Sequence, residues 1–245
     1  MSLFHPFLEN KFMSLKVASS IAVLAIASSS SAAMVYGGGT ETGNRFNPGS
    51  GVITYMNCFT AVGAGQTQLE LESAIVGIRR IASAGALTDV GIKIYAAEMT
   101  FDGTNYGRGA NYEIYGSTSL GGGTASVTQL VNSGAVSGVT LNLETVSSAG
   151  FGGWWIGVQF TGVNAASTAN GWRVVNAPTT GASINAFGMY NYNSSGAFAA
   201  FFAFGNPPGS SPSRLMVDVN GTLVPAPGAL ALLGLAGLAT RRRRN

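Results

Sequence analysis

The middle of the chain contains the run Gln68-Leu69-Glu70-Leu71-Glu72, in which polar and apolar residues alternate without a break. Successive side chains of a β-strand point to opposite faces, so the two leucines would share one face and the two glutamates the other. Such alternation is typical of a strand with one face on a hydrophobic core and the other in water. The run therefore predicts a half-buried β-strand.

Similar short runs recur through residues 51–223, separated by turns rich in Gly, Asn and Ser. In one of them Val90, Ile92 and Ile94 would point inward, and Asp102-Gly103 after it is a hairpin signal. No stretch of this region keeps a 3.6-residue period for three helical turns, which disfavours a parallel sheet interleaved with helices. The sequence predicts an all-β domain over 51–223, an antiparallel two-sheet sandwich of jelly-roll type, preceded by a flexible lead-in at 34–50. The expected strands cover 52–59, 68–72, 74–81 as its continuation or as the next strand, 90–95, 112–115, 125–131, 139–143, 154–160, 171–175, 184–192, 198–204 and 215–219.

The charges of the chain are distributed unevenly. It carries 13 Lys and Arg against 10 Asp and Glu, a net charge of +3. Six of the bases and one acid lie near the two ends, which leaves seven bases and nine acids for residues 34–224. Arg79 and Arg80 are the only adjacent bases there, and in a strand they would point to opposite faces. We therefore expect no nucleic-acid partner.

The C-terminal segment has three parts in a fixed order. Val224-Pro225-Ala226-Pro227 is followed by the apolar stretch 228–240 and then by Arg241-Arg242-Arg243-Arg244. Thirteen helical residues span roughly 20 Å, so with the preceding Leu223 and Val224 the segment only just crosses a bilayer core of about 30 Å. The arginines would lie on the cytoplasmic side and the domain outside. The segment predicts a single transmembrane helix.

This arrangement resembles the PEP-CTERM sorting signal, which bacterial exosortases recognise and cleave. The resemblance covers residues 224–245, and Ala226 stands where the family's name motif has Glu, so the match is to a VPAP variant. It implies an exosortase-type sorting protease and the membrane as partners, a cell-envelope, outer-surface or extracellular location, and a link to exopolysaccharide and biofilm production.

The N-terminal segment predicts export independently. Lys16, the apolar run 17–27 and the small residues 28–33 form the three parts of a signal peptide over 1–33, with an apolar helix and cleavage after Ala33 or Ala32. Met1-Ser2-Leu3 recurs as Met13-Ser14-Leu15, which makes Met13 a second candidate for the true start.

Few residues of the predicted domain suit catalysis. The one histidine, His5, lies in the leader, and the one cysteine, Cys58, lies in an apolar run that predicts a buried thiol. Nucleophile–histidine pairs and ordinary zinc sites are thereby excluded from residues 34–224.

Glu70 and Glu72 could form a carboxylate pair as in glycoside hydrolases, but strand alternation explains them. Glu98, Asp102 and Glu113 could converge near the Asp102 turn, although lone surface acids are the simpler interpretation. We therefore expect no catalytic residues and no enzyme.

Two kinds of binding site remain open. Asp102, Thr104 and Asn105 offer oxygen ligands that suit calcium, although a hairpin turn explains this loop equally; no other cofactor is expected. Exposed aromatic rings with polar neighbours can stack on sugars, and alternation would expose one ring of the Trp154-Trp155 pair. The candidate glycan-binding residues are Trp154, Trp155, Trp172, Arg173, Tyr190 and Tyr192.

Three functions follow from these observations. The first is a non-enzymatic cell-surface or matrix protein, exported and sorted by its tail. The second is a carbohydrate-binding module that uses exposed aromatics, and the third, least supported by the residues, is a polysaccharide-active enzyme.

Overall fold

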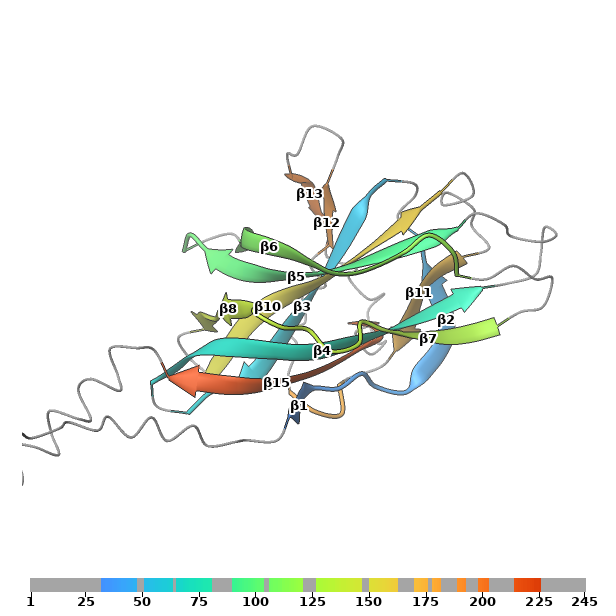
Figure 1. Ribbon diagram of the computed structural model, residues 1–245. Helices are drawn as coiled ribbons and strands as arrows, with labels where there is room; N and C mark the ends of the chain where they lie inside the picture. Colours follow the sequence, from blue (N-terminus) through green and yellow to red (C-terminus); the bar gives the residue numbers. More distant parts are fainter. Residues whose placement is uncertain are drawn as a thin grey trace, which may run out of the picture. The chain divides into compact units, whose positions relative to one another are not determined.

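The fold was analysed in a computed structural model of the 245-residue chain. It describes residues 32–47, 51–63, 65–80, 90–103, 106–120, 127–146, 150–162, 170–175, 178–181, 189–192, 198–202 and 214–225. Of the hairpin at 189–202 only strand backbone is described. These ranges form fifteen strands and no helix (Figure 1). The predicted signal peptide up to residue 31 and the predicted transmembrane helix at 228–240 lie outside them.

The strands form two main antiparallel sheets, as the sequence predicts. The eight-stranded sheet has the order β1 (Ala33–Tyr36), β15 (Val217–Pro225), β4 (Gln66–Arg80), β11 (Asn170–Val175), β14 (Arg214–Leu215), with β2 (Glu41–Phe46) on β11 and with β7 (Val127–Asn132) and β8 (Thr140–Asn142) on β4. The five-stranded sheet has the order β3 (Ile53–Ala61), β10 (Phe151–Thr161), β5 (Gly91–Phe101), β6 (Tyr106–Ser117), with β9 (Glu144–Val146) on β10. A separate hairpin pairs β12 (Met189–Tyr192) with β13 (Phe198–Phe202).

The main hydrophobic core lies between these two sheets. It takes residues from both, for example Leu69 and Val76 of β4 facing Ile92 and Ile94 of β5. The inward positions predicted for Leu69, Leu71, Val90, Ile92 and Ile94 are all confirmed, because each of these side chains is buried. Burial of these apolar surfaces, at about 25 cal/mol per Å², is the main force that holds the sheets together.

The two ends of the domain differ from the sequence prediction. The lead-in expected at 34–50 contains β1 and β2, so it is not an unstructured approach to the domain. Of the two alternatives left open for 74–81, the structure confirms that this run continues 68–72 in one strand, β4. β15 continues beyond 223 to Pro225, because Val224 and Pro225 pair with Gln68 and Gln66 of β4.

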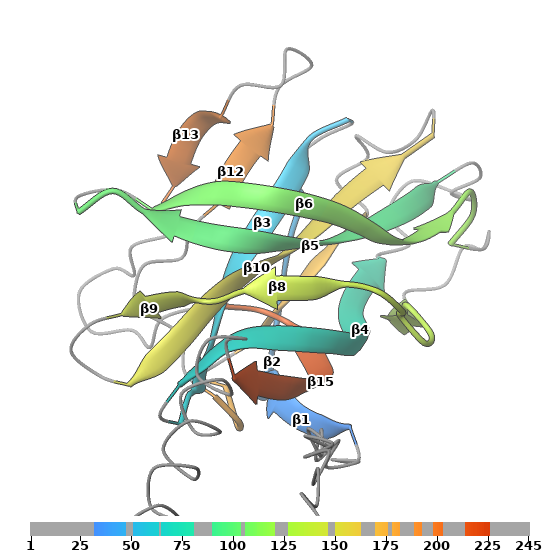
Figure 2. The ribbon, with the colours of Figure 1, turned by 60° about the vertical axis from the view of Figure 1, so that its left-hand side comes forward.

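The chain crosses from one sheet to the other between β8 and β9. β8 pairs with β4 in the eight-stranded sheet, whereas β9 pairs with β10 in the five-stranded sheet. Figure 2 shows these two short strands in line, between β5 and β4. One side of the sandwich is thus bridged by continuous chain.

Candidate functional site

The three tryptophans proposed for sugar stacking are all in the protein interior. Trp154, Trp155 and Trp172 are 0%, 1% and 1% exposed. Trp154 meets Tyr36 edge to face in the core, with ring centroids 6.5 Å apart. Trp172 donates from Nε1 to the carbonyl of Met216 at 2.8 Å. Because a stacking platform needs an open ring face, these rings cannot act as one in this fold.

The expectation that alternation exposes one ring of the Trp154-Trp155 pair is wrong, because both rings are buried. Trp154 points into the core and Trp155 away from it, but a second apolar cluster covers the outer face of the five-stranded sheet. Gly153 and Gly157 flank Trp155 on that face. A Cβ at Gly153 would lie 2.5 Å from the Phe59 ring, and one at Gly157 would lie 2.6 Å from the Tyr55 ring. The two glycines therefore let aromatic rings of β3 lie on either side of Trp155 and bury it.

Polar groups of this outer cluster bond to one another. Tyr55 receives a hydrogen bond on its hydroxyl from Arg108 Nη1 (2.7 Å) and donates to Asn111 Oδ1 (3.0 Å). The Arg108 guanidinium also lies 5.5 Å from the centre of the Tyr55 ring. Tyr95 donates to Gln159 Oε1 at 2.9 Å. These bonds fix the rings, so we assign this cluster a structural role.

Burial changes the acidity of both tyrosines. It raises the pKa of Tyr55 to about 12, against the opposing effect of the Arg108 charge. Burial, assisted by the carboxylate of Glu113, raises the pKa of Tyr95 to about 12. Both phenols therefore stay neutral at physiological pH, because a buried phenolate would lose its hydration.

The remaining glycan candidates do not join the tryptophans. Arg173 lies in the eight-stranded sheet, on the face opposite to the buried Trp172. Tyr190 and Tyr192 belong to β12 in the separate hairpin, and their side chains lie outside the described part. The six candidates are thus spread over three sheets instead of one binding face.

The calcium candidates lie where β5 turns into β6. Asp102 is exposed and Gly103 has φ +96°, a conformation that glycine adopts without strain. Thr104 and Asn105 lie outside the described residues. Within the described ranges no three His, Cys, Asp or Glu residues come close enough to hold a metal ion.

The acidic residues near this turn do not converge. The Glu98 carboxylate accepts hydrogen bonds from Asn142 on β8 and from the Ala110 amide. Glu113 instead forms an ion pair with Lys93 at 2.8 Å. Glu70 is exposed and Glu72, half-buried, accepts a bond from the Thr222 hydroxyl at 2.9 Å, which confirms the outward face predicted for this pair.

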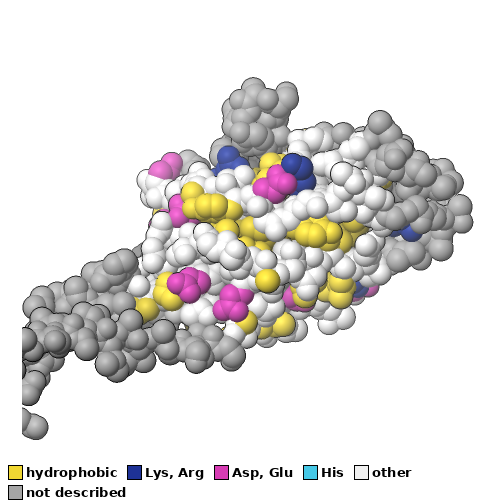
Figure 3. Space-filling view, viewed as in Figure 1, with side chains coloured by type: hydrophobic (Ala, Val, Ile, Leu, Met, Phe, Trp, Pro, Cys, Tyr) yellow, Lys and Arg dark blue, Asp and Glu magenta, His cyan; other side chains and the backbone are white. Residues whose placement is uncertain are grey.

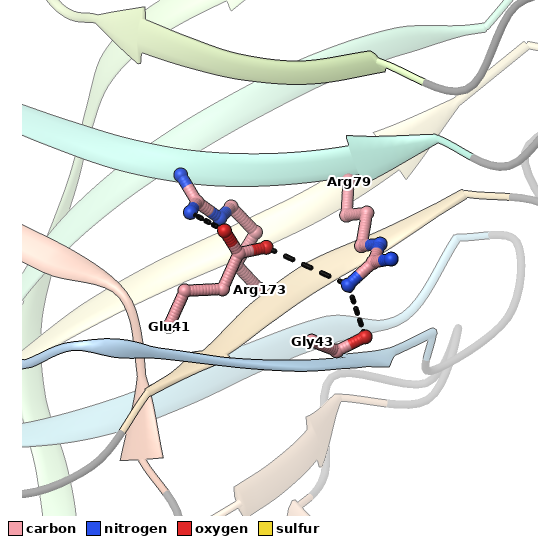
Figure 4. A network of polar contacts seen from close by, with 4 residues as sticks. All are labelled: Glu41, Gly43, Arg79 and Arg173. Atoms are coloured by element: carbon pink, nitrogen blue, oxygen red, sulfur yellow. Dashed lines mark hydrogen bonds and ion pairs between the residues drawn. The ribbon is translucent and has the colours of Figure 1, made fainter.

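A charged cluster that the sequence did not predict lies at the other end of β4 (Figure 4). Glu41 of β2 bonds to the guanidinium of Arg173 and forms an ion pair with Arg79 at 3.6 Å. Arg79 also donates to the carbonyl of Gly43. Arg45 lies directly opposite Arg173 in the β2–β11 ladder and so shares its face. The Glu41 carboxylate thus joins the guanidinium groups of Arg79 and Arg173, and Arg45 lies on the same face.

Strand pairing explains why this cluster escapes notice in the sequence. Arg45, Arg79 and Arg173 are far apart in the chain, and only the ladders of β11 with β2 and with β4 make them neighbours. The one local signal was the pair Arg79-Arg80, which by itself suggested separation onto two faces.

The predicted sorting motif begins inside the fold. Val224 and Pro225 are the last residues of β15, whereas Ala226, Pro227 and the arginines at 241–244 lie outside the described residues. Over the described residues, the structure contains no helix with the length and apolar character needed to span a membrane.

Comparisons with known proteins identify no relative of this chain. No protein-family model, no curated protein and no solved structure matches the chain.

Proposed function

We propose that this chain is an exported, non-enzymatic cell-surface or extracellular-matrix protein, sorted by its C-terminal PEP-CTERM-like signal. Its location is the cell envelope, the outer surface or the exterior, with a single-pass membrane stage before or instead of release. An exosortase-type protease is its sorting partner, and exopolysaccharide is the material with which it is associated.

The observation that carries this proposal is the pairing of β1 with β15. The domain begins at β1, directly after the predicted leader, and ends with β15, inside the predicted sorting motif. These strands are antiparallel neighbours, with Ala33 opposite Gly221 and Met34 opposite Asn220. Leader and tail therefore join the fold at adjacent points, so both can be removed or retained without cutting through the sheets.

The cleavage positions fit this arrangement. Cleavage after Ala32 would leave β1 whole, and cleavage after Ala33 would remove only its first residue. At the other end, Pro225 lies at a register irregularity at the end of β15, and such irregular positions tolerate proline. The jelly-roll connection belongs to the same proposal and is supported by the pairing of the first strand with the last.

The test is mass spectrometry of both ends of the full chain produced in a host that has an exosortase. We expect an N-terminus at Ala33 or Met34, recovery outside the cytoplasm, and loss of residues 241–245. An intact Arg241–Arg244 in the envelope fraction would mean plain anchoring. A cytoplasmic chain with an intact leader would overturn the proposal.

A matched pair of variants separates the signals. Replacing Arg241–Arg244 by glutamine removes the terminal charge and should abolish C-terminal processing, while the leader is still cleaved. Replacing Lys11 by glutamine changes a base upstream of Met13 and should alter neither end. Unchanged processing of the arginine variant would contradict sorting by this tail.

A further inference from the structure

Strands of both sheets meet at the end of the sandwich where β15 stops. Pro225, the last residue of β15, lies opposite Gln66 at the start of β4. The turn before Gln66 is bonded to the turn before β10, because Val62 N donates to the Gly150 carbonyl at 3.0 Å. Figures 1 and 2 show that β5 and β9 also end on this side, where β10 begins. We call this surface the tail end, which includes Ala61, Val62, Phe101, Tyr106, Phe151 and Pro225.

The tail end carries a pair of aromatic rings at the surface. Phe101 and Tyr106 lie opposite each other in the β5–β6 ladder, and their ring centroids are 4.7 Å apart. Phe101 is 42% exposed, and Tyr106 and Phe151 are only partly buried against the outer cluster. The space-filling view shows hydrophobic side chains at the surface over the start of β6 (Figure 3). Apolar ring surface is therefore in contact with water at this end.

The predicted transmembrane stretch begins close to this surface. Only Ala226 and Pro227 separate Pro225 from residue 228, where the apolar run starts. Three residue steps extend over at most about 11 Å. With the predicted helix in a bilayer, the end of β15 lies within that distance of the first apolar residue. A single helix with its side chains is already about 10–12 Å wide, so no folded protein fits between the tail end and the lipid.

The length of the predicted helix brings the domain closer still. Residues 228–240 span roughly 20 Å as a helix, less than the bilayer core of about 30 Å. Leu223 and Val224, which could have lengthened the helix, are paired in β15 and belong to the sandwich. A short helix is accommodated by local thinning of the bilayer and by flanking residues that reach its interface. The residues next to the helix on the exported side are those of the tail end.

We propose that the tail end docks on the lipid surface into which the predicted helix inserts, with Phe101 and Tyr106 at the level of the headgroups. The docking rests on the proposed function, because it requires the single-pass membrane stage. Aromatic rings favour the interface between water and hydrocarbon, where a tyrosine buries its ring and keeps its hydroxyl among polar groups. Phe101 enters the outer part of the acyl region, and the Tyr106 hydroxyl bonds to the headgroups.

The charges beside the ring pair favour a zwitterionic lipid surface. Asp102 is exposed next to Phe101, and burial together with the nearby Glu144 carboxylate raises the pKa of Tyr106. The phenol therefore stays protonated and can donate to a lipid phosphate. Anionic headgroups would repel the two carboxylates, whereas the ammonium groups of zwitterionic lipids attract them.

The test measures the lipid contact of one new thiol in the full-length chain. Cys58 is buried, so Phe101→Cys supplies a single accessible thiol at the tail end, and Leu130→Cys supplies one at a control position. Leu130 is 55% exposed and lies opposite Gly77. Gly77 follows Gln66 by eleven residues, about 36 Å along β4. Each thiol is labelled with bimane, and the chain is reconstituted in phosphatidylcholine vesicles that contain a nitroxide-labelled lipid.

We expect a blue-shifted emission and several-fold stronger nitroxide quenching at residue 101 than at residue 130. Flotation of the vesicles shows whether the chain is inserted, which separates the two proposals. Equal quenching at the two positions in floated vesicles would overturn the docking and leave the membrane stage intact. A chain that does not float with the vesicles would overturn the membrane stage, and the docking with it.

Charge substitution gives the second arm of the test. The bimane is moved to Ala61→Cys, an exposed position at the end of β3 that leaves the ring pair in place. Phe101→Glu then puts a carboxylate where the ring meets the lipid, and Leu130→Glu makes the same change at the control position. Quenching at residue 61 should fall several-fold with Phe101→Glu and stay unchanged with Leu130→Glu, while circular dichroism confirms that both variants are folded. Undiminished quenching in folded Phe101→Glu would refute docking through the ring pair.

Discussion

Glu98 on β5 and Asn142 on β8 join the two sheets through a single carboxylate oxygen. Glu98 Oε1 accepts one bond from the Asn142 backbone amide at 3.0 Å and another from its side-chain amide at 2.6 Å. The backbone amide belongs to a short strand that ends where the chain crosses between sheets. The carboxylate thus accepts a hydrogen bond from a backbone N–H group that would otherwise lack a partner at the edge of a strand.

Removing this carboxylate should destabilise the sandwich. We expect Glu98→Ala to lower the free energy of unfolding by about 1–2 kcal/mol, as for loss of charge-assisted hydrogen bonds that are partly exposed to water. Asn142→Ala should lower the free energy of unfolding by a smaller amount, because the backbone amide of residue 142 remains. A double-mutant cycle measured in urea should show energetic coupling between Glu98 and Asn142. Glu113→Ala, which removes an exposed ion pair with Lys93 and no bond between the two sheets, should lower the free energy of unfolding by about 0–1 kcal/mol. Equal costs for the two glutamates would contradict the bridging role.

Loss of the hydroxyl should lower the stability of the protein at Tyr55 but not at Tyr36. The Tyr36 hydroxyl is buried and has no hydrogen-bond partner among the described residues, whereas the Tyr55 hydroxyl has two. Tyr36→Phe should leave stability unchanged or raise it by about 1 kcal/mol, since a buried unsatisfied group is removed. Tyr55→Phe should lower it by about 1–3 kcal/mol, because the partners lose their bonds. Thermal unfolding of the two matched variants tests this contrast.

The glycines beside Trp155 should resist substitution. Gly153→Ala and Gly157→Ala would each press a methyl group into a fixed aromatic ring, at an expected cost of about 1–3 kcal/mol. Gly116→Ala is the control, since its added Cβ meets only the movable carboxylate of Glu113. Similar melting temperatures for all three variants would show that the rings can move aside.

Stability should fall between pH 10 and 12. An unfolded tyrosine releases its proton near pH 10, whereas folded Tyr55 and Tyr95 hold theirs to a pKa of about 12. In this window the unfolded chain binds fewer protons, so the free energy of unfolding decreases as the pH rises. Urea titrations at several pH values should show this slope, and Tyr55→Phe should reduce it. A flat profile would mean that the phenols ionise equally in both states.

The single thiol should be unreactive until the protein unfolds. Cys58 is fully buried, and burial raises the pKa of its thiol. Since the thiolate is the reactive form, Ellman's reagent should label the native chain only as fast as it opens. Phe101→Cys, at a position that is 42% exposed, should add one rapidly labelled thiol per chain. Rapid labelling of native Cys58 would contradict its position in the core.

How far the sequence predicts the site depends on the range of the interaction involved. The turn at Asp102 and the outward direction of Glu70 and Glu72 follow from adjacent residues and were predicted correctly. The expected exposure of one ring in the Trp154-Trp155 pair rests on alternation alone, which says which way Trp155 points and not what covers it. Gly153 and Gly157 were the available signal, because glycines that alternate with a tryptophan leave room for neighbouring rings.

The sequence by itself determined the all-β class and the inward faces of β4 and β5, because the two-residue period of a strand is a local property. The predicted export signals likewise rest only on the order of residues along the chain. Only the tertiary structure decided that Trp155 is buried, that residues 34–50 supply two strands, and that Arg79 and Arg173 meet at Glu41. These depend on register: a hydrogen-bonded ladder sets which distant residues become neighbours, and nothing local in the chain specifies that choice.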